Sequence, residues 1–553
     1  MQKMFRKSTR NENLRLFVMT QIIMFASSAS GAGFGVVTGN DHHTVDTGAG
    51  LVFRVVKNTG DIDSIQWRGT ELNDRSRDSG IASGLGPQGT TTRVQAGTDV
   101  AMITVRTDSK NGVVANLTHY YIVRKGDNTI YMATHAEKQP RVGELRWITR
   151  LQGDLFPEVP EGSNNRSNTG NIESKDVVGM ADGTTRSKYY GNDQARNLTL
   201  RGVTGPGRGV FMAYGNRESS SGGPFFRDIQ FQSGSSVEVY NYMNSGHAQT
   251  EVKRSGVLYG PYALCFTAGE KPALPEMAFI SGLGLTGEVP AARRGRTAVK
   301  LLGRDPNHEY TVGFSSPTAQ YWAAADPAHG GAVSPGMKPG AYRMTVYKGE
   351  LEIHTANVKV TAGLTQRLED VTLGADPSRV LPLWRIGDWD GTPLEFRNGK
   401  NISLMHPSDK RQADWTPGPF TVGTSTPSDF PSCQWMKVNS GQLVNFKLTA
   451  AQITDSVVRI GITTAHNAAR PKIRLNSWSS RIPAPSAQSD SRGLTIGTYR
   501  GNNKMHTFDV PAKALVVGEN TLEISVVSGN GGDGFLSPGY AIDCVDMHAK
   551  PSP

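Results

Sequence analysis

Two segments carry side chains that could transfer protons near neutral pH. The segment NYMNSGHAQTE, residues 241–251, places His247 behind a Ser-Gly turn that follows an aromatic run. The segment TTRSKYYGND, residues 184–193, places Lys188 two positions after Arg186. If this segment is extended, both side chains project to one side, and the guanidinium favours the uncharged form of the lysine. Such a lysine acts as a base, whereas a histidine can act as an acid, a base or a metal ligand.

A strand-like run supplies a candidate cation. In ELRWITRL, residues 144–151, the two-residue period of a strand places Arg146, Ile148 and Arg150 on one face. One face of this predicted strand therefore carries two guanidinium groups, and the other face is apolar.

The aromatic run before His247 supplies candidate sugar contacts. The same alternation places Tyr240, Tyr242 and Asn244 on one face that leads to the histidine. Tyrosine rings on a strand pack against the C–H faces of sugars. Each segment also has a plain structural interpretation: the tyrosines are half buried beside a turn histidine, and the RSK stretch is a charged surface turn. The pattern alone leaves both interpretations open.

Taken together, the candidates fit one reaction. Breaking a uronic acid glycoside by β-elimination needs a base for the proton on C5, a cation to stabilise the carboxylate, and an acid for the departing oxygen. Lys188, Arg146 and His247 fill these roles in that order. The reaction needs no metal, and the chain has neither HEXXH nor EF-hand spacing. No cofactor is therefore expected in catalysis.

Length and composition predict several all-β domains. The chain has 553 residues, 63 of them glycine and 30 proline, so about three domains are expected. Short β-rich runs separated by turn residues dominate, and no long helical period competes with them. We predict a large sheet-built domain over 33–287, a small β-sandwich over 288–376 and a jelly roll over 377–553.

The N-terminus has the pattern of a secretory signal. Basic residues precede an apolar run over 16–26, and small residues follow it, with cleavage predicted after Ala32. Removing residues 1–32 lowers the formal net charge from +10 to +6, since five basic residues and one acidic residue leave. We expect a secreted protein with no membrane anchor. Its basic charge suits an acidic polysaccharide better than nucleic acid, although ordinary surface charge is an equal explanation.

The cysteine count excludes a disulfide-rich scaffold. Of Cys265, Cys433 and Cys544, the last two are the better candidates for one bridge because both lie in the C-terminal third. Glycosylation sequons begin at four positions, Asn116, Asn165, Asn197 and Asn401.

A family resemblance covers the chain from about residue 33 to its end. It is carried, in order and with similar spacing, by GELRWITRL, TRSKYYG, ESSSGGPFFRD, YMNSGHAQTE, GPY, MKPGAYRMTVYKGE, IGDWDGTP with FRN, MHPSD, DSRG with YRG, and LSPGYAIDCV. Together these motifs closely resemble the fungal-type rhamnogalacturonan lyases of polysaccharide lyase family four.

The resemblance implies a fold and a substrate. The fold would be an N-terminal β-supersandwich of the galactose-mutarotase kind, a fibronectin type III-like middle domain and a C-terminal jelly roll like a carbohydrate-binding module. The substrate would be the backbone of rhamnogalacturonan I, cut by β-elimination between rhamnose and galacturonic acid. A monomer is expected, and a structural calcium ion in the third domain is left open.

The resemblance also implies roles for single residues. The lysine of TRSK, Lys188, would be the base, the histidine of NSGH, His247, the acid, and the arginine of GELR, Arg146, the group that neutralises the carboxylate. Tyr240 and Tyr242 would contact substrate. From the third domain, Arg492 of DSRG would reach the substrate, with Arg500 of YRG as a weaker candidate.

The chain departs from the family at two points. Ile496 stands where relatives can carry an arginine, so one basic contact is missing here. Several cysteines of the N-terminal domain in fungal relatives are also absent.

Two other functions stay open at this point. A hydrolase would need two carboxylic acids about 5 to 10 Å apart, and Glu144, Asp154, Glu218, Asp228 and Glu251 could supply such a pair. A non-catalytic carbohydrate-binding protein would hold the polymer without cutting it.

Overall fold

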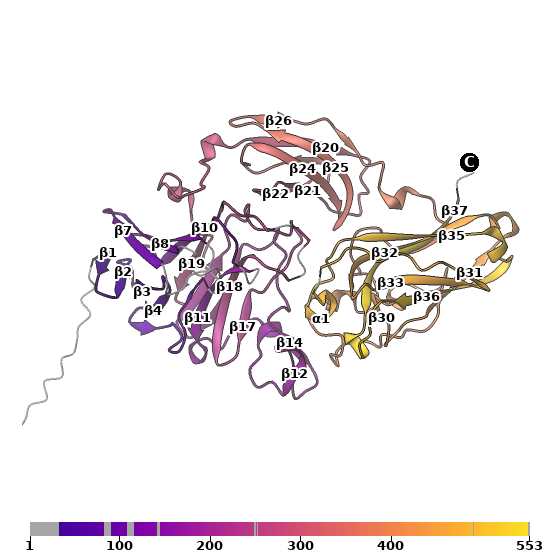
Figure 1. The fold of residues 1–553 in the computed structure, drawn as a ribbon, viewed down its shortest axis with the longest axis horizontal. Helices are drawn as coiled ribbons and strands as arrows, with labels where there is room; N and C mark the ends of the chain where they lie inside the picture. The colour runs from indigo at the N-terminus through magenta and orange to yellow at the C-terminus, as the bar shows by residue number, and fades with distance from the viewer. Residues whose placement is uncertain are drawn as a thin grey trace, which may run out of the picture.

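The regular secondary structure of the computed structural model is almost entirely β-strand, which confirms the all-β class (Figure 1). It describes residues 33–81, 90–107, 116–140, 144–247, 250–251, 253–489 and 491–550. The predicted signal segment, 1–32, lies outside these residues. Within them, no helix is long and apolar enough to cross a membrane.

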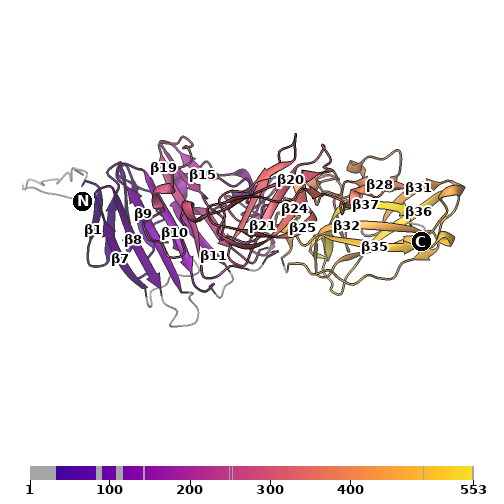
Figure 2. The same cartoon turned by 90° about the horizontal axis from the view of Figure 1, so that it is seen from above.

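The strands form three successive groups, which we call the N-terminal, middle and third domains. Figures 1 and 2 show the middle domain bridging the other two. The longest α-helix in the described part of the chain is the single turn α1, Gly493–Ile496. Short 3-10 helices occur at η1 Gly153–Leu155, η2 Glu161–Ser163, η3 Ala278–Ile280, η4 Ala291–Arg293, η5 Pro377–Arg379, η6 Gly399–Asn401, η7 Pro427–Asp429, η8 Ala450–Gln452, η9 Ala512–Ala514 and η10 Gly534–Leu536.

The N-terminal domain contains two large sheets. The first has strand order β1 Gly35–Thr38, β2 His42–Asp46, β3 Leu51–Val56, β4 Ile62–Trp67 and β5 Thr70–Glu71. The second has the order β15 Leu200–Gly205, β16 Arg208–Ala213, β19 Val257–Thr267, β10 Thr129–Ala136, β9 Leu117–Arg124, β8 Val100–Thr107 and β7 Thr90–Ala96. Strands β9 and β10 are antiparallel neighbours joined by a short turn.

Two smaller sheets of the same domain carry the candidate site. One has the order β17 Phe231–Ser233, β18 Ser236–Asn244, β11 Leu145–Gln152 and β6 Gly80–Ile81. The other has the order β12 Gly170–Glu173, β13 Val177–Gly179 and β14 Thr185–Ser187. One buried cluster, which includes Phe53, Tyr121, Trp147 and Phe266, joins the large sheets to β11 and β18.

The middle domain is a small sandwich of two sheets, as predicted. Its strands are β20 Arg296–Leu302, β21 Tyr310–Ser315, β22 Gln320–Ala324, β23 Gly331–Val333, β24 Gly340–Lys348, β25 Leu351–Val360, β26 Thr365–Arg367 and β27 Val371–Thr372. One sheet has the order β23-β20-β26 with β27 beside β20, and the other has the order β22-β21-β24-β25. A separate apolar core fills the space between them.

The third domain is also built from two sheets. One contains β28 Trp384–Gly387, β37 Gly539–Ala549, β32 Ser456–His466 and β35 Lys504–Val510, with β30 Cys433–Trp435 beside β37. The other has the order β29 Phe420–Thr421, β31 Gln442–Leu448, β36 Gly518–Val527, β33 Arg470–Leu475 and β34 Trp478–Ser479. The helical turn α1 lies in the long connection between β34 and β35.

The predicted disulfide between Cys433 and Cys544 is wrong. Both thiols are free and buried, as is Cys265. The register explains why: Cys433 lies opposite Ala541 on β37, three residues from Cys544. At about 3.3 Å per residue the separation is roughly 10 Å, beyond the reach of a disulfide. The Cys544 thiol donates instead to the Gly387 carbonyl, at 3.6 Å.

Buried ion pairs and hydrogen bonds join the domains. Glu218 of the N-terminal domain accepts from Arg294 at 2.6 Å and from the Tyr321 hydroxyl at 2.7 Å, and it pairs with Lys338 at 3.1 Å. Burial alone would raise the pKa of Glu218, but these partners lower it to about 2. The middle domain is therefore fixed to the N-terminal domain by an ionised carboxylate.

Candidate active site

The side chains of β11 and β18 form the floor of the candidate site. The two strands are antiparallel neighbours, with Arg146 opposite Tyr242 and Ile148 opposite Tyr240. Arg146 donates to the Tyr242 hydroxyl at 2.7 Å, and its guanidinium carbon lies 5.5 Å from the centre of that ring. The predicted alternation on β11 is confirmed, since Leu145 and Trp147 face the core while Arg146 faces the site.

A β-bulge changes the alternation on β18. The register shifts between Leu145 and Arg146, so Asn244 lies opposite the buried Leu145. Asn244 donates to Gln139 at 2.9 Å and to Tyr259 at 3.0 Å. The prediction that Asn244 shares a face with the two tyrosines is therefore wrong.

The tyrosine pair is mostly covered. The rings of Tyr240 and Tyr242 stack with 5.7 Å between centroids, and the two residues are 5% and 3% exposed. They belong to an apolar cluster that also contains Ile148 and Tyr189. Little ring surface is left for a sugar, so a direct contact with substrate remains a prediction for both residues.

His247 lies in the turn after β18, between two carboxylates. Its Nδ1 is 3.2 Å from Asp228 Oδ1, and its Nε2 is 3.2 Å from Glu144 Oε1. Its backbone N–H donates to Ser245 Oγ at 3.1 Å, and the Ser245 hydroxyl donates to Asp228. Burial lowers the pKa of His247, but the two carboxylates outweigh it and the net shift is upward. The site therefore favours the protonated imidazolium.

Lys188 lies beside the same Tyr189 ring that His247 contacts. Its Nζ is 5.5 Å from the centre of the Tyr189 ring, and the His247 ring is 5.3 Å from the same centre. The Tyr189 hydroxyl is 3.3 Å from His247 Nε2. The charge of Lys188 also lowers the pKa of His247, although less than the carboxylates raise it. The structure thus brings both candidate proton carriers to one aromatic ring.

The neighbours of Lys188 differ from those expected. Lys188 is the first residue of the turn after β14, so strand alternation does not align it with Arg186. Arg186 donates to Glu161 at 2.8 Å, whereas Lys188 Nζ lies 2.7 Å from Asp176 Oδ1. Carboxylates rather than a second cation therefore contact these two side chains.

Arg146 and His247 share one carboxylate. An Arg146 Nη1 proton is donated to Glu144, whose other oxygen contacts His247 Nε2. Glu144 thus bridges the guanidinium of Arg146 and the imidazole of His247. Sequence reasoning considered Glu144 and Asp228 only as hydrolase acids and did not consider Tyr189, although all three stand inside the quoted motifs.

The third domain forms the opposite side of the site. Ser491 Oγ is 3.5 Å from the Gly246 carbonyl oxygen, and Ile496 packs against the cluster that contains Tyr189. Arg492 precedes α1, its side chain is 36% exposed, and its Nη1 lies 3.6 Å from Glu173. Arg492 is thus on the face of the third domain that approaches His247.

Arg500 is placed differently. Its guanidinium lies between the rings of Phe225 and Tyr347, at 5.1 Å and 5.9 Å, and 3.9 Å from Glu350. Its side chain is 11% exposed and is held where the three domains meet. The described contacts of Arg500 are with residues other than Lys188 and His247.

Models of known families match the three domains in turn. Residues 34–287 match the N-terminal domain of rhamnogalacturonan lyase B. Residues 293–368 and 382–547 match domains II and III of polysaccharide lyase family 4.

Whole-chain relatives agree with these matches. Rhamnogalacturonate lyase A from Aspergillus aculeatus is 38% identical over 535 residues, which cover 96% of this chain and 99% of that protein. Rhamnogalacturonate lyase A from Emericella nidulans is 37% identical over 541 residues, which cover 96% and 99%. The chain belongs to the rhamnogalacturonan lyases of polysaccharide lyase family 4. Its three domains are therefore the N-terminal domain of these lyases, the fibronectin type III-like domain II and the carbohydrate-binding-module-like domain III.

Membership in this lyase family fits the arrangement of the carboxylates. Of the five acids considered for a hydrolase, Glu218 is held at the middle domain, Glu251 pairs with Arg254 at 3.1 Å, and Asp154 is exposed on η1. The remaining two, Glu144 and Asp228, both contact His247. Glu144 and Asp228 are therefore bound to one imidazole and do not form the pair of acids on either side of a glycosidic bond that a hydrolase needs.

The lyase has no evident metal centre in the part of the chain that the structure describes. No group of three or more His, Cys, Asp or Glu side chains there is placed to hold a metal ion. In the third domain, the buried Asp543 lies near Asp390 and Glu395. Burial, and to a smaller extent the charge of Asp390, raises the pKa of Asp543 well above the usual range. The structural calcium ion left open for the third domain stays a prediction.

Proposed function

We propose that this rhamnogalacturonan lyase cuts the α-1,4 bond between rhamnose and galacturonic acid in rhamnogalacturonan I, with Lys188 as base and His247 as acid. The observation that carries the assignment is the pair of proton carriers around Tyr189, one of them held as an imidazolium by two carboxylates. An acid must carry its proton before the reaction, and the contacts of His247 favour that state.

The elimination balances with these groups alone. The uncharged Lys188 amine takes the proton from C5 of the galacturonate, and the electron pair of that bond forms the C4–C5 double bond. The C4–O bond breaks, and His247 gives its proton to the departing oxygen. Arg146 binds the carboxylate while it takes on enolate character, which lowers the barrier to removing the C5 proton.

The carboxylates around the site define its resting state. Glu144 bonds to Arg146 and Asp176 contacts Lys188 before substrate enters. A uronate that binds Arg146 takes the place of Glu144, and Lys188 must lose its proton before it acts. Asp228 stays on the far nitrogen of His247 and keeps the ring oriented throughout.

The third domain contributes a basic contact. Arg492 is the arginine on the face that approaches His247, and we assign it to a neighbouring uronate of the chain. Ile496 packs on the Tyr189 cluster where relatives can carry an arginine, so this position supplies apolar contact rather than charge.

Export as a monomer completes the proposal. The basic and apolar segment over 1–26 supports secretion, since the polymer lies outside the cell. Sequencing the N-terminus of protein recovered from culture medium tests it, with a new terminus expected near Gly33. Sedimentation at equilibrium tests the monomer.

The reaction is tested by incubating the protein with purified rhamnogalacturonan I beside homogalacturonan. Ultraviolet absorbance and product masses are then followed. We expect absorbance to grow only with rhamnogalacturonan I, with products that carry an unsaturated uronate. Shortened products without that absorbance would indicate a hydrolase, and binding without any shortening would indicate a non-catalytic module.

A further inference from the structure

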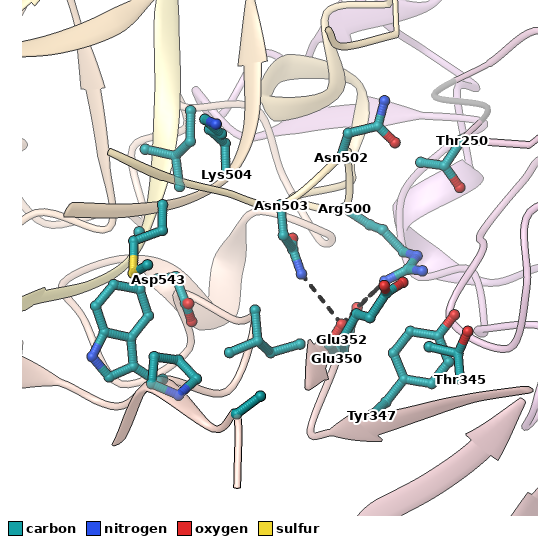
Figure 3. A pocket seen from close by; sticks show the side chains of 18 of the residues that line it. Thr250, Thr345, Tyr347, Glu350, Glu352, Arg500, Asn502, Asn503, Lys504 and Asp543 are labelled. Carbon is teal, nitrogen blue, oxygen red and sulfur yellow. Dashed lines mark hydrogen bonds and ion pairs between the residues drawn. The ribbon is translucent and has the colours of Figure 1, made fainter. Parts of the chain in front are cut away.

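A cavity of about 610 Å³ lies where the three domains meet (Figure 3). It is separate from the small space of about 10 Å³ beside His247. Its walls include Thr250 and Glu251 from the N-terminal domain. The middle domain and the third domain supply the rest, among them Thr345, Glu350, Arg500, Asn502, Asn503 and Lys504. Cavities of this size accept ligands as large as a short oligosaccharide.

One layer of side chains divides this cavity from the candidate active site. Arg227 lines the space beside His247, and its guanidinium lies 5.2 Å from the centre of the Tyr499 ring. The Tyr499 hydroxyl donates to Glu350 Oε1 at 2.7 Å, and Glu350 lines the cavity. Thr250 and Glu251 follow His247 closely in the chain, so both spaces border the same segment.

Two buried polar atoms of the wall have no hydrogen-bond partner within the part of the chain that the structure describes. They are Glu350 Oε2 and Arg500 Nε. Glu350 is 5% exposed, and its other oxygen already accepts from Gln194 and Tyr499. Figure 3 shows Asn503 and Arg500 both reaching Glu350. Both atoms are buried, so they do not themselves face the cavity, and they mark the wall behind it as polar.

Among the described cations of the wall, two lie near carboxylates and one does not. Arg343 pairs with Glu352 at 2.5 Å, and Arg500 lies 3.9 Å from Glu350. Lys504, the exposed first residue of β35, has no carboxylate within ion-pair distance among the described residues. An ammonium beside amides and hydroxyls suits a ligand with one carboxylate and many hydroxyl groups.

We propose that this cavity is a second carbohydrate-binding site, which takes a short acidic oligosaccharide and binds its uronate carboxylate through Lys504. Asn502, Asn503 and Thr345 are placed to bond the hydroxyl groups. The identity of the sugar rests on the proposed function, because the active site beside this cavity would cut rhamnogalacturonan I and so bring that polymer to it. Binding there holds a chain beside the active site between successive cuts.

The test counts binding sites on the full chain. In a Lys188→Ala background, which spares the ligand, a purified rhamnogalacturonan tetrasaccharide is titrated calorimetrically. We expect two sites for each chain. Adding Lys504→Glu should weaken one of them at least about ten-fold, whereas Lys513→Glu, a matched reversal at an exposed position of η9 outside the cavity, should leave both. Met505→Trp, which fills the cavity from an exposed position, should remove the same site.

Each outcome separates this proposal from the proposed function. One site in the Lys188→Ala chain, unchanged by Lys504→Glu, overturns the second site even if the wild type still makes unsaturated product. Two sites in a protein that makes no unsaturated product would keep the cavity and overturn the lyase mechanism. Loss of a site with Lys513→Glu would show that general charge, and not the cavity, holds the ligand.

Discussion

At the scale of single residues, the site holds its cations against its own carboxylates. Lys188 contacts Asp176, Arg146 contacts Glu144, and His247 contacts both Glu144 and Asp228. The arrangement keeps buried charges paired before an acidic polymer arrives. In the proposed mechanism the two sides of His247 have different tasks, because substrate displaces Glu144 and leaves Asp228 in place.

Replacing Asp228 should shift the pH dependence of the reaction. The carboxylate raises the pKa of His247, so Asp228→Asn lowers it and the acid loses its proton at a lower pH. The alkaline limb of kcat should therefore move toward lower pH, as measured by ultraviolet absorbance across a pH series. Asp154→Asn, at an exposed position, is the matched control. An unchanged alkaline limb in Asp228→Asn would remove His247 from the role of acid.

Removing either proton carrier should abolish most turnover. Lys188→Ala and His247→Ala should each lower kcat about 10²- to 10⁴-fold, the usual contribution of one general acid or base. Both side chains are partly exposed, at 22% and 25%, so the fold should persist. Circular dichroism checks the fold and absorbance checks the rate. Near-normal turnover in one variant would reassign that residue.

At the scale of strands and turns, the sequence predicts which face of a regular strand a side chain occupies, but not where a bulge or a strand end changes that face. The period of two predicted correctly which side chains of β11 face the core and which face the site. It failed at Asn244, because a bulge adds a residue to β18, and at Lys188, because β14 ends one residue earlier. Bulges and strand ends depend on the neighbouring strand, which a local pattern does not contain.

The strand register also makes a prediction about thiols. Cys433 on β30 lies opposite Ala541, three residues from Cys544 on β37, and all three cysteines are buried. A thiol reagent should therefore label none of them in the native protein. After unfolding in guanidinium without reductant, all three should react. The measurement is the mass of the labelled chain. Two unreactive cysteines in the unfolded chain would indicate a disulfide after all.

At the scale of the whole molecule, the candidate site is shared between domains. Family motifs indicated Lys188, His247 and Arg146 as its centre, and the structure brings them together. They also suggested Arg500, which lies at the junction beside Glu350, and its contact with substrate stays a prediction. That placement depends on how three domains pack, and no motif within one domain encodes it.

The contact between the first two domains should be lost in acid. The pKa of Glu218 is about 2 in the folded protein, below its ordinary value, so its stabilisation is complete above that ordinary value and lost as the pH falls toward 2. The shift corresponds to roughly 3 kcal/mol. Glu218→Gln should lower the melting temperature at pH 7 and flatten its decline in acid, as followed by calorimetry. Glu369→Gln, exposed in the middle domain, should behave like the wild type. Equal acid sensitivity in Glu218→Gln would show that other groups govern the transition.

The turn that carries Lys188 is anchored from outside its own domain. Thr185 donates through its N–H and hydroxyl to Asp409, Tyr190 donates to the Thr495 carbonyl, and Gly191 donates to the Ser403 carbonyl. An excised N-terminal module would keep Lys188, His247 and Arg146, the side chains of the proposed reaction. It would still lose the contacts that hold the turn of Lys188 in place. Shuffling this module onto a foreign C-terminal partner would therefore have to transplant the anchoring loops along with it.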